Sequence, residues 1–401
     1  MSLNLDSIPY FKFTAVNSQI PVQETIISPD ETLWTHPDFP DVSVRRTFFR
    51  GGPSDGVELF TLTNENLSVC VMPTRGMGIW KVDVKKSSGE TVRVGWNSPV
   101  PRPVNPRNVP LDQPDGLGWL RGFNEFVARC GLESNGAPEF NENGTLRWPL
   151  HGRLQNTPAH WVELTFDVLR KEFILTGVVH EGRLFFNDLH FRSSLRLPFF
   201  GRTFFVEDVV RNFSARPAEF ELLYHVNIGQ PVADGGGTME IPFRRMVPRC
   251  PWAAQNIHKA RELHPPVTAE PEMCYFYELS ADRNGNTETF LKNPEGDFGV
   301  ALEFNRNEFP YFCQWKAQHA AEDGYVTGME PCINFPNART FEKAHGRVAE
   351  LQPQEARTFH LTFRFCANKA QVEQEIAAVA ELQALCPAPE ISPNPTEDWC
   401  G

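Results

Sequence analysis

Short runs in which apolar and polar residues alternate recur every 10 to 15 residues from Ala159 to Ile228, with no long helical segments between them. Alternation of this kind predicts strands that bury one face. A parallel sheet would need long crossover connections between its strands, so antiparallel pairing is favoured. Earlier in the chain, residues 57–62, 67–71 and 79–84 have the pattern of three successive strands separated by turns. The sequence therefore predicts an all-β chain of antiparallel sheets packed face to face.

Composition supports one large β domain. The chain has 32 Phe, 34 Pro and 28 Gly in 401 residues, a mixture that favours strands and turns over long helices. No linker is recognisable from residue 45 to residue 365. We expect an N-terminal extension packed on the body at 1–44, the β domain at 45–366, and a C-terminal helix and tail at 367–401. Apolar residues at helical spacing predict that helix from Asn368 to Leu385.

Charge and motif content exclude several functions. A formal net charge of −12 opposes binding to a phosphate backbone, so no nucleic-acid partner is expected. No run of 18 apolar residues and no signal peptide is recognisable, which predicts a cytoplasmic protein without a membrane partner. The nine cysteines lack C-x-x-C spacing and are expected to be reduced. Zinc-binding histidine motifs are also missing, so no metal site is predicted.

Two residues are candidates for proton transfer. Glu330 lies in the Pro-punctuated segment 328–337, interpreted as a loop behind the aromatic run 309–315. Aromatic neighbours that exclude water could raise the pKa of this carboxyl toward that of a general base. His225 ends a strand-like run and titrates near neutrality. The alternatives are a loop acid that bonds a backbone amide and a half-buried strand histidine.

Six further residues are candidates for contact with a ligand, and several of them border a long loop. The Pro-rich stretch from Pro99 to Gly144 is predicted to form one wall of a cleft, because long loops inside compact domains are usually functional. Its aromatic and polar side chains suit a ring with hydroxyls and apolar C–H faces. The predicted ligand-contacting residues are Arg75, Asn124, His151, Arg153, Asn227 and Trp315.

Four motifs in order resemble the galactose mutarotase (aldose 1-epimerase) superfamily. They are Pro149-Leu150-His151-Gly152-Arg153, Tyr224-His225-Val226-Asn227-Ile228-Gly229, Gly328-Met329-Glu330-Pro331 and the closing segment 351–359, in which Gln354 replaces the usual glycine. The resemblance covers roughly residues 45 to 365. Segments 73–77 and 126–132 are similar to a branch of aldose 1-epimerase-like proteins that has a long Pro-rich loop and an N-terminal extension.

This resemblance implies a β-supersandwich and a sugar substrate, in a monomer or homodimer that needs no cofactor. It implies that Glu330 takes the proton of the anomeric hydroxyl while His225 protonates the ring oxygen, so that the ring opens and recloses as the other anomer. His151, Arg75 and Arg153 would hold hydroxyls, and Trp315 would contact the C–H face.

Two alternatives and the identity of the sugar stay open. One is a carbohydrate-binding or sensing protein without turnover, although binding alone does not require both an acid and a base. The other is a polysaccharide lyase or glycoside hydrolase, but a hydrolase normally needs two carboxylates, and only Glu330 is a strong candidate. The arginines Arg75, Arg121 and Arg153 leave an acidic sugar open.

Overall fold

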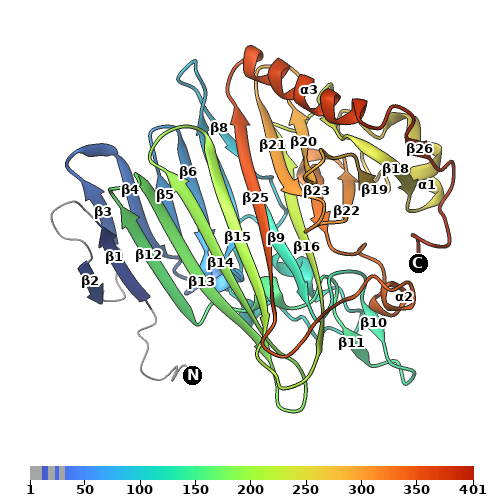
Figure 1. Ribbon diagram of the computed structural model, residues 1–401, viewed down its shortest axis with the longest axis horizontal. Helices are drawn as coiled ribbons and strands as arrows, with labels where there is room; N and C mark the ends of the chain where they lie inside the picture. The colour runs from blue at the N-terminus through green and yellow to red at the C-terminus, as the bar shows by residue number, and fades with distance from the viewer. Residues whose placement is uncertain (1–10, 17–22, 27–31) are drawn as a thin grey trace.

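Two large sheets pack face to face in the computed structural model, which describes residues 11–16, 23–26 and 32–401 (Figure 1). Within those ranges one sheet has ten strands and the other fourteen. Pairing is antiparallel except between β1 and β12 and between β18 and β26. The predicted all-β class and antiparallel architecture are confirmed.

The ten-stranded sheet has the order β17-β20-β21-β25-β15-β14-β13-β12-β1-β2. Its strands are β1 (Phe11–Val16), β2 (Gln23–Ile26), β12 (Trp161–Asp167), β13 (Glu172–Gly182), β14 (Asp188–Pro198), β15 (Thr203–Asn212), β17 (Thr238–Glu240), β20 (Asn286–Lys292), β21 (Gly299–Asn305) and β25 (Ala356–Cys366).

The fourteen-stranded sheet has the order β26-β18-β19-β22-β23-β16-β9-β7-β6-β5-β4-β3, with β24 beside β16 and β8 beside β7. Its strands are β3 (Thr32–His36), β4 (Phe39–Phe48), β5 (Glu58–Thr63), β6 (Leu67–Met72), β7 (Gly78–Lys85), β8 (Thr91–Val94), β9 (Val127–Leu132), β16 (Ala218–Gly229), β18 (Phe243–Pro248), β19 (Met273–Leu279), β22 (Tyr311–Ala317), β23 (Val326–Cys332), β24 (Ala349–Leu351) and β26 (Glu390–Ile391). A separate hairpin pairs β10 (Glu139–Phe140) with β11 (Leu146–Trp148).

The helices are short apart from one. They are α1 (Pro251–Gln255), α2 (Arg339–Ala344) and α3 (Lys369–Ala384), with 3-10 turns at η2 (Gly52–Ser54), η3 (Pro73–Arg75), η4 (Pro106–Asn108), η5 (Gly118–Gly122), η6 (Leu154–Asn156), η7 (Ile257–Lys259) and η8 (Ala321–Asp323). Helix α3 confirms the predicted C-terminal helix. Asn368 caps it by accepting a hydrogen bond from the backbone N–H of Gln371. Within the described ranges, no helix is both long enough and apolar enough to cross a membrane.

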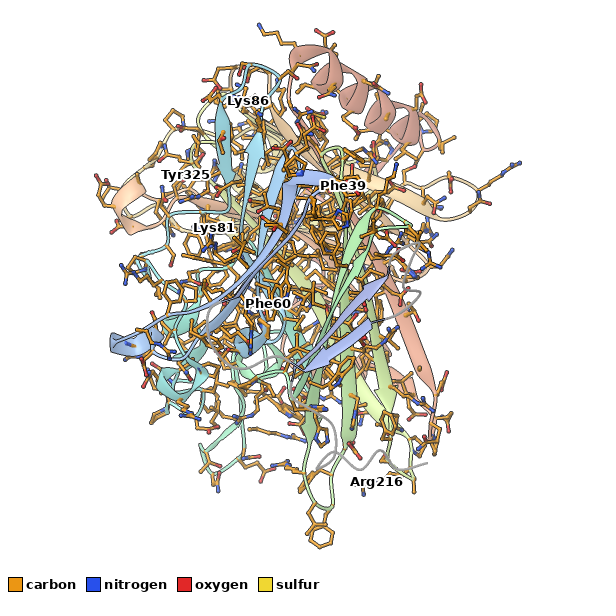
Figure 2. All side chains as sticks on the ribbon, turned by 90° about the vertical axis from the view of Figure 1, so that its left-hand side faces the viewer. Phe39, Phe60, Lys81, Lys86, Arg216 and Tyr325 are labelled. Atoms are coloured by element: carbon orange, nitrogen blue, oxygen red, sulfur yellow. The ribbon has the colours of Figure 1, made fainter. Side chains whose placement is uncertain are left out.

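The core lies between the two sheets, where the inward residues of each strand meet. On β15 the buried positions alternate, and Phe204, Val206 and Val210 share the inner face. Phe60 of the opposite sheet is fully buried and lies in the crowded centre of the side-chain view (Figure 2). Helix α3 adds a smaller apolar cluster by packing Val372 and Val379 against the ten-stranded sheet.

The N-terminal residues contribute to both sheets. β1 and β2 extend the ten-stranded sheet, whereas β3 and β4 form an edge of the other one. The expected boundary between residues 44 and 45 falls inside β4, so the described part of the extension is built into the sandwich. The division of the chain into three parts therefore stays a prediction.

A buried ion pair joins the sheets at the centre of the core. Arg129 of β9 donates from Nε to Asp208 Oδ2 of β15 at 2.7 Å, and from Nη2 to the Ser193 hydroxyl at 2.9 Å. The Tyr224 hydroxyl of β16 donates to the same Asp208 oxygen at 2.6 Å. Because both charged groups are almost fully buried, each depends on the other for the solvation it loses on folding.

We expect Arg129→Met to lower the free energy of unfolding by about 3–5 kcal/mol, the usual cost of leaving one buried charge without its partner. The matched control is Arg192→Met, whose exposed ion pair with Glu207 should contribute less than about 1 kcal/mol. Urea unfolding of the purified variants at pH 7 measures both values. Equal losses in the two variants would show that the buried pair has no special importance.

Candidate active site

A cavity of about 590 Å³ lies over the outer face of the fourteen-stranded sheet. Strand alternation explains why its polar side chains are there. Arg129 and Tyr224 point into the core between the sheets, so their chain neighbours Ala128 and His225 point the opposite way. The segment between β8 and β9 covers this outer face and encloses the space.

The register of the sheet brings His225 and Glu330 together. Leu223 pairs with Cys332 and Val226 with Met329, which places His225 of β16 opposite Glu330 of β23. His225 Nε2 lies 3.3 Å from Glu330 Oε1. The two candidates for proton transfer, 105 positions apart in the sequence, are thus adjacent side chains on one face of the sheet.

Glu330 lies within a strand and not in the loop that the sequence predicted. It pairs with Cys313 of β22, although Pro331 follows it directly. Gly328 makes room for its carboxylate, because a Cβ added there would lie 2.2 Å from Glu330 Oε1 and 3.2 Å from Trp315 Cβ. Glu330 Oε1 is buried without a hydrogen bond of good geometry. A buried, unsatisfied carboxylate oxygen indicates a place for a ligand proton.

Burial sets the charge state of Glu330. Loss of solvent raises the pKa of this carboxyl to about 8, although a hydrogen bond from Cys313 acts in the opposite direction. The carboxyl therefore holds its proton at neutral pH and releases it in mildly basic solution. A pKa close to neutrality lets the group exchange a proton with a partner, which suits acid–base catalysis.

Asn227 fixes the tautomer of His225. Its side-chain NH2 donates to the carbonyls of Glu125 and His225, so its oxygen is free to accept a hydrogen bond from His225 Nδ1 at 2.6 Å. The neutral imidazole then carries its hydrogen on Nδ1 and presents the Nε2 lone pair to Glu330. Burial, followed by the nearby His151, lowers the pKa of His225 well below 6.5. Asn227 is fully buried and positions His225, and its predicted contact with a ligand stays a prediction.

His151 lines the same cavity beside His225, with the two rings 5.4 Å apart. Its Nδ1 bonds the carbonyl of Asn135 at 2.8 Å, which leaves Nε2 as an acceptor in the neutral ring. Burial lowers the pKa of His151 to about 4, so the ring is neutral at physiological pH.

Aromatic rings from the long loop form one wall of the cavity. Trp119 and Phe123 stack against each other and lie beside His225, with Phe123 at 5.1 Å between ring centroids. Trp315 from β22 lies 5.1 Å from the same imidazole and also lines the cavity. The loop therefore lines the cleft as predicted, and its role in choosing a ligand stays a prediction.

Neither of the two predicted arginines lines the cavity. Arg75 is fully buried and donates from Nε to Glu125 Oε1 at 3.0 Å and from Nη2 to the carbonyl of Gly122. Arg153 is partly exposed and forms an ion pair with Asp112. Both guanidinium groups have protein partners outside the cavity lining, and their contact with a ligand stays a prediction.

Asn124 also lies outside this lining. Its NH2 group donates to the carbonyl of Val100, and the residue borders a neighbouring cavity of about 450 Å³. The predicted contact between Asn124 and a ligand stays a prediction.

Among the charged residues of the cavity that sequence reasoning missed are Arg249 and Glu272. Arg249 follows β18, and Glu272 immediately precedes β19 and accepts a hydrogen bond from Trp315 Nε1 at 2.7 Å. Both lie in stretches without a motif. Only the pairing of β18, β19, β22 and β23 shows that they face Glu330.

One group in the described residues has the spacing of a metal site. His180, Asp188 and His190 lie beside the turn of the β13–β14 hairpin, with Asp188 Oδ1 bonded to His180 Nε2 at 2.7 Å. This group belongs to the ten-stranded sheet and is separate from the cavity.

Comparison with protein-family models shows to which family the chain belongs. The model described as "Domain of unknown function (DUF4432)" matches residues 54–365. The chain belongs to the DUF4432 family. The matched region contains both sheets' central strands and every residue of the His225–Glu330 site. Among curated proteins, no sequence matches this DUF4432 chain.

Solved structures place this DUF4432 protein among mutarotase-like folds. A protein of Klebsiella pneumoniae subsp. pneumoniae MGH 78578 named "putative aldose 1-epimerase" has 29% identity and a TM-score of 0.86, over 92% of this chain and 96% of that one. A galactose mutarotase-like protein of Clostridium acetobutylicum has 14% identity and a TM-score of 0.55, over 81% and 98%. A protein of Escherichia coli K12 with the same name as the first has 14% identity and a TM-score of 0.51, over 77% and 99%. The resemblance seen in the sequence is confirmed for the fold.

The raised pKa of Glu330 predicts how Glu330→Gln changes stability with pH. In the folded DUF4432 protein the carboxyl keeps its proton until about pH 8, whereas an unfolded chain releases it near 4.5. Between these values the unfolded state binds fewer protons, so the wild type loses stability as pH rises. The amide loses no proton, so the variant's stability relative to wild type should increase from pH 5 to pH 8 and then level off, by on the order of a few kcal/mol.

Urea unfolding of both proteins at pH 5, 6, 7, 8 and 9 measures this difference. A difference that does not change with pH would contradict the raised pKa of Glu330.

Proposed function

We propose that this protein is an aldose 1-epimerase that interconverts the α and β anomers of a sugar. The observation that carries the proposal is the His225–Glu330 pair, whose carboxylate oxygen lacks a hydrogen bond inside an aromatic-walled cavity. Anomer interconversion needs a base for the anomeric hydroxyl and an acid for the ring oxygen. The mutarotase-like fold and the named relative of 29% identity support the same activity.

The pair needs to hold only one proton. For the reaction this proton moves from Glu330 to His225 Nε2, 3.3 Å away, which leaves Glu330 as a carboxylate. Glu330 takes the proton of the anomeric hydroxyl as His225 gives its proton to the ring oxygen, so the bond between C1 and the ring oxygen breaks and an aldehyde forms. Rotation about the C1–C2 bond and the reverse transfers close the ring as the other anomer. Each cycle returns the proton to the pair, so no cofactor takes part.

The remaining lining residues hold the sugar in place. Neutral His151 can accept a hydrogen bond from a hydroxyl, because its Nδ1 is already bonded to the carbonyl of Asn135. Trp315 and Trp119 offer apolar faces to the C–H groups of the ring. The hydrogen bond from Asn227 keeps the His225 ring oriented while it exchanges its proton.

The activity can be tested by the exchange of anomeric resonances in NMR spectra of reducing aldoses, after the spontaneous rate in the same buffer is subtracted. Wild type should accelerate the exchange for at least one sugar. Methyl glycosides of the same sugars test the hydrolase alternative, since Glu272 is a second carboxylate in the lining. Cleavage of a methyl glycoside would replace the epimerase proposal with a hydrolase.

We expect Glu330→Gln to lower kcat about 10²- to 10⁴-fold, the usual contribution of a positioned acid or base, while sugar binding survives. His225→Ala should likewise lower kcat much more than it weakens binding. The matched control is Glu207→Gln, because Glu207 is an exposed carboxylate of β15 on the other sheet. Binding without turnover in wild type would favour the sugar-sensing alternative, and an active Glu330→Gln would remove Glu330 from the mechanism.

The pH profile of kcat/KM should be level near neutrality and fall above about pH 8. The pair keeps its single proton between the lowered pKa of His225 and the pKa of about 8 of Glu330. Above the upper value the last proton is lost and no acid remains for the ring oxygen, so the rate should fall about tenfold per pH unit. Catalysed exchange that still increases through pH 9, after subtraction of the spontaneous rate, would contradict this assignment.

A further inference from the structure

Arg249 directly follows β18, which is separated from the Glu330 strand β23 by β19 and β22. Arg249 lines the proposed active site from that side. Trp315 pairs with Gly328 and with Cys274, and the backbone N–H of Arg249 donates to the Cys274 carbonyl at 2.9 Å. Residues opposite each other in an antiparallel ladder share a face. Arg249, Cys274 and Trp315 therefore form one row beside the row of Glu330, and all three line the cavity.

Arg249 is the one Lys or Arg among the described residues that line this cavity. Its side chain is partly buried, and within the described part of the chain the charges that act on its pKa, Glu272 among them, do so without a side-chain hydrogen bond to its guanidinium. Three other arginines differ from Arg249 in this respect: Arg75, Arg129 and Arg153 each form an ion pair with an acidic residue. The protein supplies no close counter-charge to this group, so a bound anion can form charge-assisted hydrogen bonds with it.

The acidic residues near Arg249 do not satisfy it. Glu272 and Asp323 are exposed residues of the cavity lining, and Glu272 Oε2 already accepts the Trp315 indole hydrogen. Glu330 feels the charge of Arg249, which acts to lower the pKa of its carboxyl, so the two groups lie in the same electrostatic environment. A guanidinium in this position is available to a ligand.

The position of Arg249 also fixes which end of a sugar it can reach. Three strand spacings separate the backbones of Glu330 and Arg249, or about 14 Å at about 4.8 Å per spacing. A glutamate, one sugar ring and an arginine side chain together span such a distance. With the anomeric carbon at Glu330 and His225, the opposite end of the ring lies toward Arg249.

We propose that the substrate is an aldose with a carboxylate or phosphate ester at the end of the ring remote from the anomeric carbon, and that Arg249 binds this negative group. The planar guanidinium matches the paired oxygens of either group, whereas hydroxyls of a neutral sugar need no full charge. This inference rests on the proposed epimerase function and names its substrate class. The sequence left an acidic sugar open on Arg75, Arg121 and Arg153, but it is Arg249 that lies in the cavity.

The test compares glucose, glucose 6-phosphate and glucuronate, and the matching galactose series, with wild type, Arg249→Gln and Arg249→Lys. Wild type should show kcat/KM about 10- to 100-fold higher for one of the charged sugars than for its neutral parent, the usual value of a charge-assisted hydrogen bond. Arg249→Gln should remove this preference by raising KM for the charged sugar more than for its neutral parent. Arg249→Lys should restore part of it, because lysine keeps the charge but not the planar fork.

The matched control is Arg192→Gln, an exposed arginine of β14 paired with Glu207, which should keep the wild-type preference. The phosphate and carboxylate arms decide which group the site takes. Equal use of neutral and charged sugars by wild type, or a preference that survives in Arg249→Gln, would overturn the inference while leaving the epimerase function intact.

Calorimetric binding of the same sugars separates the two proposals. Charged sugars that bind through Arg249 without any anomer exchange would support the anion site and reject the epimerase function.

Discussion

The buried ion pair between Arg129 and Asp208 is the contact on which the active-site geometry depends. It joins the two sheets at their centre and also holds the Tyr224 hydroxyl. Because side chains alternate along a strand, an arginine and a tyrosine fixed toward the core force Ala128 and His225 to the outer face. A shift of β16 by one residue would turn His225 toward the core. A shift of β9 by one residue would turn Arg129 to the outer face, away from Asp208. The cost of that misplacement keeps the register unique.

A second polar network fixes the orientation of His225 once its face is set. Arg75 bonds Glu125, whose carbonyl accepts from Asn227, and Asn227 accepts from His225 Nδ1. Each member is buried and most of its donors are satisfied, so a change in one disturbs the others. Through this network the buried Arg75 affects the site although it does not line the cavity. The network holds the imidazole that faces Glu330.

The cavity combines groups that are unfavourable for stability and useful for proton transfer. Glu330 is buried without a full set of hydrogen bonds, and both histidines are neutral because water is excluded by Trp119, Phe123 and Trp315. Desolvation therefore brings the proton affinities of the pair into a range that serves acid–base chemistry near neutrality. The same exclusion of water strengthens any contact between Arg249 and a negative group. The energetic cost is borne by the large core between the sheets.

The sequence by itself determined the class of the fold, helix α3 and the identities of the paired residues Glu330 and His225, because alternation, helical spacing and short motifs are local signals. The sequence placed Glu330 in a loop, because a proline such as Pro331 usually indicates a turn. The strand that contains both residues is stabilised by pairing with β22, which the local sequence does not show. The sequence also assigned Arg75 and Arg153 to a ligand, because a sequence shows that an arginine is present but not whether a carboxylate already holds it. Only the tertiary structure brought Arg249 to the cavity, through the order of β18, β19, β22 and β23. Strand order depends on packing across the whole sheet, and no local pattern records it.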